Sequence, residues 1–374
     1  MDVVSFLVQY LVVAGVYSLL AISMNIEYGW AGIPNFGKAA FIAAGGIAAA
    51  ITATRIGPPL LLGMDPASPA TLDFFGYYNG AVLPAYQQHP LDTWLVFAIS
   101  ALIGGAIAVV MAVAFSYPAV RLREDYLAIA LLMAAQLVWL VIRVYKPIMG
   151  GTMSLPLPGP DFKSIAARIA GPNPPAVLVD TLRALFVWGL VILYLYYVEK
   201  QMNSPFGRKL RMIRDDEVAA EALGRNVARA RLEAMVIGSF LAGIAGAVYS
   251  LVYFSSVNPD NYLPELTFLV LTFVLVGGVG NNVGSILGAA AMAFIERLSY
   301  TVGTNLAAFH GLDWGSYIYY LVYGLAIILA IFFRPYGLLP EKPVRTPAWK
   351  VYMAVRGKTP PFMQNILDKL RMRR

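Results

Sequence analysis

A run of glycine and lysine near the N-terminus is the first stretch whose spacing could serve a chemical role. Residues 31–40 read AGIPNFGKAA, in which Gly32, four further residues and Gly37-Lys38 reproduce most of the phosphate-binding loop G-x-x-x-x-G-K-[ST]. The next residue is Ala39, so the hydroxyl that would bind Mg²⁺ is missing. An uncharged run, VVSFLVQYLVVAGVYSLLAISM, precedes the loop, where a nucleotide-binding domain would have a β-strand. The stretch does not predict nucleotide hydrolysis, and its glycines need another explanation.

Other reactive side chains are scarce. The chain has no cysteine, which excludes disulfides and thiolate metal sites. His89 and His310, the two histidines, stand in polar or turn-rich contexts that favour solvated loops over metal ligation. No Ser-His pair or cluster of metal-ligating residues stands out, so we expect no catalytic residue, no metal and no cofactor. An intramembrane enzyme is therefore disfavoured.

The composition of the chain indicates that it consists mainly of membrane-spanning segments. Only 13% of the 374 residues are charged and mean hydropathy is +0.66, whereas an ordinary soluble domain carries about 25% charged residues. A span needs about 20 apolar residues to cross the hydrocarbon core, and several stretches reach that length. The N-terminus lacks a cleavage site and reads as an uncleaved span. We predict an all-α polytopic membrane protein in the lipid bilayer of the cytoplasmic (inner) membrane. Basic cytoplasmic loops, and not binding to nucleic acid, explain the net charge of +7.

The distribution of lysine and arginine predicts the topology. Both the 199–231 loop and the tail beyond residue 340 are rich in basic residues, whereas 56–92 has none, and cytoplasmic loops carry the basic excess. The uncharged 266–295 segment must then cross twice, turning at GGVGNN, to keep the tail inside. We expect about nine spans, with the N-terminus outside and the C-terminus inside: 3–24, 38–55, 93–117, 126–145, 177–198, 232–254, two within 265–310, and 314–333.

This topology divides the chain into a transmembrane domain, 1–340, and a basic cytoplasmic tail, 341–374. Loops 56–92 and 146–176 lie outside, although the basic residues Lys146, Lys163 and Arg168 in the second loop run against the charge rule. The tail ends in PPFMQNILDKLRMRR, which is either an amphipathic segment on an anionic membrane surface or a frayed terminus.

The inner loop contains a short helix with clear start and stop signals. In RDDEVAAEALGRN, Asp215, Asp216 and Glu217 stand near the start, where carboxylates interact favourably with the helix dipole. Gly224 follows the last helical residue, where a left-handed cap is common. An apolar face is formed by Val218, Ala219, Ala222 and Leu223. A helix this short is marginal alone, so it packs either on its own membrane domain or on a cytoplasmic partner.

Several segments, in order, resemble the permease subunits of branched-chain amino acid ABC importers, especially the LivM-like branch. They are YGWAGIPNFGKAAFIAAGGIAAA, MGGTMSLPLP, SPFGRKLRMIRDDEVAAEALGRNVARARLEAMVIGSFLAGIAGAVYS, VNPDNYLPELTFLVLTFVLVGGVGNNVGSILGAA and FFRPYGLLP. The resemblance covers about residues 10–340, and the inner-loop match makes it specific.

The resemblance implies a non-catalytic subunit that translocates branched-chain or related apolar amino acids. It implies as partners two cytoplasmic ABC ATPase subunits, a second permease subunit of the LivH-like kind, and an extracytoplasmic substrate-binding protein. It implies that residues 208–226 couple the chain to the ATPase. The residues we assign to this coupling loop are Arg208, Arg211, Arg214, Asp215, Glu217, Val218, Ala222, Leu223, Gly224 and Arg225.

Glycine-rich segments divide into two kinds. AAGGIAAA, IGGAIA, LAGIAGAVYS and ILGAAAMA are typical of seams where spans pack closely in lipid. EYGWAGIPNFG and GGVGNNVGS interrupt apolar helices, and such breaks either line a transport pathway or form plain inner turns. The candidate pathway residues are Gly32, Asn35, Phe36, Gly37, Gly150, Gly151, Thr152, Gly277, Gly278 and Asn281.

Charged residues near the predicted span ends leave two further expectations. Lys38 stands where the resembling family has histidine, and we expect its ammonium to extend toward water at the inner edge. Glu27, Arg143, Glu233, Glu265, Glu296 and Arg297 are expected to be mostly interfacial. Because no carboxylates are spaced along a span, an ion-coupled secondary transporter or channel is the weaker alternative; a urea or short-amide ABC permease is not separable by sequence.

Overall fold

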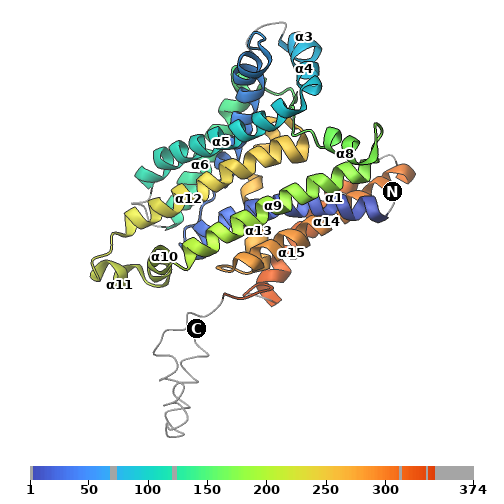
Figure 1. Cartoon of the computed structure of the whole chain (residues 1–374). Coiled ribbons are helices and arrows are strands. Elements are labelled where there is room, and N and C mark those ends of the chain that lie inside the picture. Colours follow the sequence, from blue (N-terminus) through green and yellow to red (C-terminus); the bar gives the residue numbers. More distant parts are fainter. Residues whose placement is uncertain (1–2, 68–73, 120–123, 311–313, 334–335, 342–374) are drawn as a thin grey trace. The chain divides into compact units, whose positions relative to one another are not determined.

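The computed structural model describes residues 3–67, 74–119, 124–310, 314–333 and 336–341. Residues 1–340 form one compact unit, and the predicted 341–374 tail lies, except for Glu341, outside the described residues. Nearly all of the described elements are helices (Figure 1). One antiparallel pair of two-residue strands, β1 (Leu155–Pro156) with β2 (Ser256–Val257), is a small addition to the predicted all-α fold.

Long apolar helices form the membrane domain. Six helical segments within the described residues are long and apolar enough to cross a bilayer, and one bent pair brings the number to as many as seven. The chain is therefore a multi-pass membrane protein. The six segments contain α1 (Val3–Asn25), α2 (Lys38–Ile51), α5 (Pro90–Ala119), α6 (Glu124–Val144), α9 (Ala176–Met202) and α12 (Val227–Val248), and the bent pair consists of α13 (Glu265–Gly277) and α14 (Asn282–His310). A further apolar helix, α15 (Trp314–Phe333), follows them.

Three of these helices continue through wide, π-helical turns instead of ending cleanly. Such turns are η1 (Ile26–Trp30) after α1, η2 (Thr52–Ile56) after α2 and η5 (Tyr249–Phe254) after α12. π-Helical turns are rare inside helices and frequently occur at functional sites. In η1 the turn marks the point where the first predicted interruption begins, because residues 31–37 then leave the helix altogether.

The second predicted interruption separates α13 from α14. The two helices are bent by 117° at the break, where Gly278 and Gly280 have positive φ. α13 has 13 residues, about 20 Å at 1.5 Å per residue, against a hydrocarbon core of about 30 Å. α13 alone is thus shorter than the full crossing expected for this part of the 265–310 segment.

Short elements gather at one end of the helices. They are η3 (Pro58–Leu62), α3 (Phe74–Tyr77), η4 (Tyr78–Val82), α4 (Leu83–Gln88), α7 (Lys146–Met149), α8 (Phe162–Ala170) and η6 (Pro259–Tyr262). The two predicted outer loops meet here, because the Tyr78 hydroxyl donates to the Pro156 carbonyl at 3.0 Å and the Asp161 amide to Thr93 Oγ1 at 3.1 Å. α10 (Pro205–Asp215) and α11 (Glu217–Ala222) lie at the opposite end from α8 (Figure 1).

Glycines let three helices approach to backbone contact, as predicted for the packing seams. A Cβ on Gly45 of α2 or on Gly104 of α5 would collide with the other helices, and one on Gly243 of α12 would meet the Gly104 carbonyl. Gly246 likewise lies against the Ile42 carbonyl. Lipid supplies no hydrophobic drive for helix association, so close van der Waals contact at small residues has to hold these helices together.

Candidate functional site

The basic loop after α9 folds into two short helices instead of one. Ser204 begins α10, since its hydroxyl accepts from the Phe206 amide at 3.2 Å and Pro205 occupies the first turn. α10 ends at Asp215, and the extended Asp216 separates it from α11 (φ −159°, ψ 107°). The single helix expected over RDDEVAAEALGRN is corrected on this point, because Arg214 and Asp215 belong to the end of α10.

α11 itself begins and ends as its sequence predicts. The Asp216 carboxylate accepts from the Ala219 amide at 3.0 Å and thereby caps the helix. Gly224 has φ +75°, the left-handed conformation expected after the last turn. Glu217 pairs with Arg231 at 2.6 Å, which ties α11 to the start of α12. Asp215 is at the surface beside Arg214, with 3.4 Å between the charged groups.

The apolar face of α11 is uncovered. Val218 is 77% exposed and Leu223 72% exposed, and Ala222 is also exposed. Ala220, on the other side, is buried. The alternative in which this face packs on the chain's own membrane domain is therefore not what the described residues form.

Two of the arginines around α11 face a surface cavity, and two face the membrane domain. Arg208 and Arg225 line a surface cavity of about 500 Å³ together with Phe206 and Met212. Arg211 and Arg214 instead turn toward the membrane domain. The Arg214 guanidinium donates to the Gly29 carbonyl at 2.5 Å, and that of Arg211 lies 4.5 Å from the ring centre of Trp30. Through these two contacts α10 packs against η1, the first break in the apolar helices.

A buried ion pair stands immediately behind this break. Lys38 Nζ is 3.0 Å from Glu27 Oε1, and both side chains have 0% exposure. Asn35 Nδ2 donates to the second Glu27 oxygen at 2.6 Å, and Lys38 Nζ also donates to the Ser23 and Gly238 carbonyls at 3.1 and 3.2 Å. The expectations that Lys38 extends to water and that Glu27 is interfacial are both wrong, because each charge is neutralised by the other inside the protein.

The two breaks are joined by amide side chains. Asn25 Nδ2 donates to Asn282 Oδ1 at 2.7 Å, and the Gly280 amide donates to Asn25 Oδ1 at 3.0 Å. Trp30 Nε1 donates to the same Asn282 oxygen at 3.1 Å. Asn282 Nδ2 in turn donates to Glu199 at 3.1 Å, near the end of α9. A continuous set of contacts thus runs from α10 through η1 to the turn between α13 and α14.

Predicted pathway residues fall at two separate places. Gly37 donates its amide to Asn35 Oδ1 at 3.0 Å, and Phe36 lies 5.4 Å from the Phe268 ring. A Cβ on Gly32, which has φ +69°, would press on Arg214. Gly150 and Gly151, with positive φ, lie instead beside Phe75 and Lys146 in the loop that precedes β1. The Gly150–Thr152 turn is therefore not part of the site near η1.

Gly277, Gly278 and Asn281 pack against the segment just before residue 341. The Leu338 and Leu339 amides donate to the Val276 and Gly277 carbonyls, both at 2.9 Å. Asn281 Nδ2 donates to the Pro340 carbonyl at 3.1 Å, while Asn281 Oδ1 accepts from the Gly284 amide at 3.1 Å and caps α14. These contacts give the three residues a structural role at the turn.

Sequence reasoning missed the polar side chains that connect the breaks, Asn25, Trp30 and Glu199. An available signal was Asn25 itself, an amide that directly follows a long apolar run, because polar groups within membrane segments are rare and usually functional. The partner of each group, however, comes from a distant part of the chain.

Comparison with known proteins agrees with this architecture. Residues 6–331 match the family described as the branched-chain amino acid transport system / permease component. A relative named probable branched-chain amino acid transport permease protein LivM, from Methanocaldococcus jannaschii, is 31% identical over 92% of this chain and 96% of its own length.

Two further relatives are named high-affinity branched-chain amino acid transport system permease protein LivM, from Salmonella typhimurium and Escherichia coli. Each is 28% identical over 71% of this chain, which spans 61% of the length of each. A solved structure, PsaBC from Streptococcus pneumoniae in complex with Fab, aligns at a TM-score of 0.39 and 15% identity over 88% of this chain and 92% of that one, too low to compare folds. The match over residues 6–331, together with the full-length relative, shows that the chain belongs to the permease component family of branched-chain amino acid transport systems.

Proposed function

We propose that this chain is the non-catalytic membrane subunit of an ATP-driven importer in the cytoplasmic membrane, carrying branched-chain or related apolar amino acids. Two ATPase subunits supply the energy, a second related permease completes the pathway, and an extracytoplasmic protein delivers the solute. The relatives' names support the solute class. The observation that carries the proposal is the uncovered apolar face of α11, which is connected through α10 to both helix breaks.

The coupling role follows from what α11 and α10 touch. Val218, Ala222 and Leu223 offer an apolar face to a groove on the ATPase, and an amphipathic helix in such a groove is a common recognition mode. Arg208 and Arg225, around the adjoining cavity, favour an acidic partner segment. A movement of the docked helices then displaces Arg214, and with it Gly29 of η1.

The finer topology is part of the same proposal. With α10 and α11 on the cytoplasmic side, α13 leads from the outer elements to an inner turn at residues 278–281, and α14 leads back outward. Two contacts support this direction. Asp260, before α13, is 3.8 Å from Arg143 in the last turn of α6, whereas the Gly280 amide donates to Asn25 beside η1. The chain then traverses nine times, with its N-terminus outside and its basic tail, 341–374, inside.

Substitution on the α11 face tests the coupling role. We expect Val218→Arg and Leu223→Arg to abolish both retention of the ATPase on the affinity-tagged permease and uptake of radiolabelled leucine, because a buried cation would disrupt an apolar interface. Ala228→Arg, an equal change at an exposed position at the start of α12, is the matched control and should preserve both. Normal ATPase retention and uptake in the two α11 variants would refute the docking role.

A further inference from the structure

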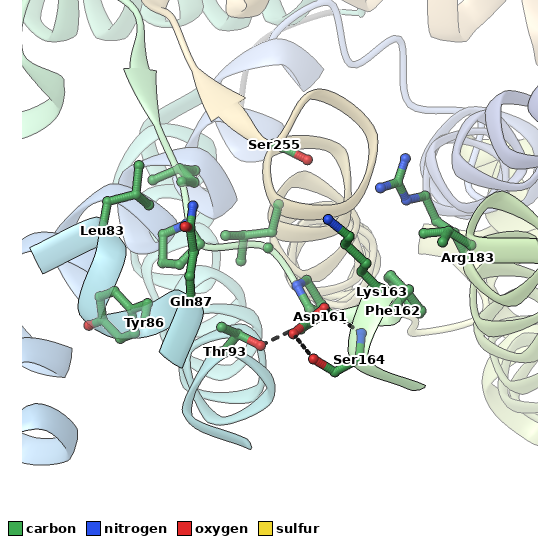
Figure 2. A pocket seen from close by; sticks show the side chains of 16 residues that line it. Leu83, Tyr86, Gln87, Thr93, Asp161, Phe162, Lys163, Ser164, Arg183 and Ser255 are labelled. Carbon is green, nitrogen blue, oxygen red and sulfur yellow. Dashed lines mark hydrogen bonds between the residues drawn. The ribbon is translucent and has the colours of Figure 1, made fainter. Parts of the chain in front are cut away.

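A cavity of about 510 Å³ opens among the outer elements (Figure 2). It lies between α4, the start of α5, the loop before α8, α8 itself, α9 and the end of η5. This volume is within the usual range for small-molecule sites, about 300–1,000 Å³. Part of its wall is apolar and consists of Leu83, Leu157, Phe162, Val179 and Leu251.

The polar groups of the wall carry a positive balance. Asp161 is already satisfied, because its two carboxylate oxygens accept from the Ser164 amide at 3.0 Å and hydroxyl at 2.6 Å. Thr93 accepts from the Asp161 amide. Lys163 makes no ion pair with any residue that the structure describes. The wall therefore presents two cationic side chains: Lys163, which has no ion pair, and Arg183, which uses one terminal nitrogen on Asp180.

Arg183 is held in place but not fully satisfied. One terminal nitrogen reaches Asp180 at 3.4 Å, and Asp180 is itself held by Gln9 of α1 at 3.4 Å. The Nε atom of Arg183 is buried and has no hydrogen-bond partner among the described residues. A buried donor without a partner is costly, and a bound anion would remove that cost. Figure 2 shows the charged ends of Lys163 and Arg183 on the same side as Ser255.

Ser255 adds strain to the same wall. It is the one non-glycine residue with positive φ (+51°) among the described residues, a conformation that costs free energy and often occurs at ligand sites. Tyr86 contributes only its ring to the wall, because its buried hydroxyl donates to the Ala53 carbonyl at 3.4 Å; Thr93 and Gln87 are neutral polar groups of the lining. The lining therefore combines cations and neutral polar groups, with one satisfied carboxylate.

We propose that this outer cavity binds a small carboxylate that carries an apolar side chain, with Lys163 and Arg183 holding the carboxylate and the Leu157–Phe162–Leu251 wall holding the side chain. Charge-assisted bonds to a carboxylate are strong and are often bidentate with arginine. The site explains why Lys163 stands on an outer loop against the usual charge distribution. The assignment of an apolar side chain to the ligand rests on the proposed function, whereas the assignment of a carboxylate rests on the cavity alone.

Arg183 also lines a second, smaller cavity. A second cavity of about 190 Å³ is lined by Arg183, Asp180, Gln9 and Arg297, together with Val12, Val13 and Tyr253. Because Arg183 belongs to both walls, a carboxylate held at the outer cavity is adjacent to polar groups between α1, α9 and α14.

Photolabelling tests the site directly. The full chain is reconstituted in phosphatidylcholine nanodiscs without its ATPase and labelled with a diazirine-bearing leucine analogue, and the labelled peptides are mapped. We expect labelling within residues 155–164 that isovalerate suppresses and isopentylamine does not. The Lys163→Gln and Arg183→Gln variants should each lower this labelling about tenfold, the factor that corresponds to one charge-assisted bond, and Arg183→Lys should retain part of it.

Arg168→Gln is the matched control, since Arg168 is an exposed cation on the same helix α8 that does not line the cavity. Undiminished labelling in both the Lys163 and Arg183 variants, or equal suppression by isopentylamine, would overturn the site. Loss of labelling in phosphatidylglycerol nanodiscs would assign the cavity to an acidic lipid headgroup and overturn it as well. Because no ATPase is present, a failure of the importer proposal in its own test would leave these results unaffected.

Discussion

At the scale of single residues, Lys38 shows how far a side chain's role depends on its surroundings. Its position near a predicted span end suggested an ammonium in water, yet Glu27, Asn35 and two backbone carbonyls enclose it. A charge in this position is stable only while its partner is present, since the desolvation cost of an unpaired buried ion is several kcal/mol. Gly238 makes the enclosure possible, because a Cβ there would collide with Glu27.

The ion pair therefore predicts a specific stability pattern. Lys38→Met should destabilise the protein by about 3–5 kcal/mol by leaving Glu27 buried and unpaired, and the Glu27→Gln/Lys38→Met double variant should recover part of the loss. Thermal unfolding of the purified chain in detergent measures both effects. Lys209→Met, which breaks the partly exposed pair with Glu233, is the control and should cost below about 1 kcal/mol. A double variant less stable than either single one would contradict the pairing.

At the scale of elements, α10 has two sides with separate tasks. Arg208 faces the surface cavity, whereas Arg214 holds Gly29 of η1. Under the proposed function, binding of the ATPase and transmission of its movement can therefore be separated by mutation, because the two contacts use different residues of one helix.

Arg214→Gln should keep the ATPase bound but reduce transport-coupled ATP hydrolysis and leucine uptake severalfold, since the connection to η1 is weakened. Arg208→Gln should have the opposite effect: its main consequence should be weaker binding of the ATPase. Co-purification and ATP hydrolysis by the reconstituted complex measure the two steps. If Arg214→Gln lost ATPase binding to the same degree as Arg208→Gln, the division of tasks on α10 would be wrong.

The α2–α5–α12 seam carries its own prediction. Gly243→Val should prevent recovery of folded protein, because the added atoms have no space beside the Gly104 carbonyl and overpacking a tight interface is destabilising. Gly189→Val on α9 is the matched control, as nothing lies within 4 Å of its Cβ position. Fluorescence-detected size-exclusion chromatography of tagged variants compares the two. A monodisperse Gly243→Val peak of normal height would be incompatible with backbone contact at this seam.

At the scale of the whole molecule, the absence of cysteine allows the proposed orientation to be tested with single introduced thiols. Gln88→Cys, exposed at the last residue of α4, should react with a membrane-impermeant maleimide on intact spheroplasts. Glu221→Cys, exposed on α11, should react only after permeabilisation. The opposite labelling pattern would invert the topology and remove α11 from the reach of a cytoplasmic ATPase.

Much of the framework was predictable because its causes are local. Span positions follow from the length of apolar runs, and α15 coincides with its predicted range, 314–333. The ends of α11 follow from Asp216 and Gly224, whose effects act over three or four residues. The same local reasoning placed one helix where two occur, because Asp215 and Asp216 both suit the start of a helix, and only the structure shows that Asp216 is the extended cap of α11.

The sequence by itself determined that this chain crosses a membrane repeatedly, resembles a particular group of permeases, and forms a short helix between basic residues. The length of apolar runs, clusters of small residues and helix caps are properties of neighbouring residues, so they can be recognised without a tertiary structure. Only the tertiary structure decided that Lys38 is paired with Glu27 and that Asn25 meets Asn282, 257 positions away. It also brought Lys163 and Arg183 to one cavity. Such meetings depend on the packing of helices far apart in the chain, which no local pattern encodes.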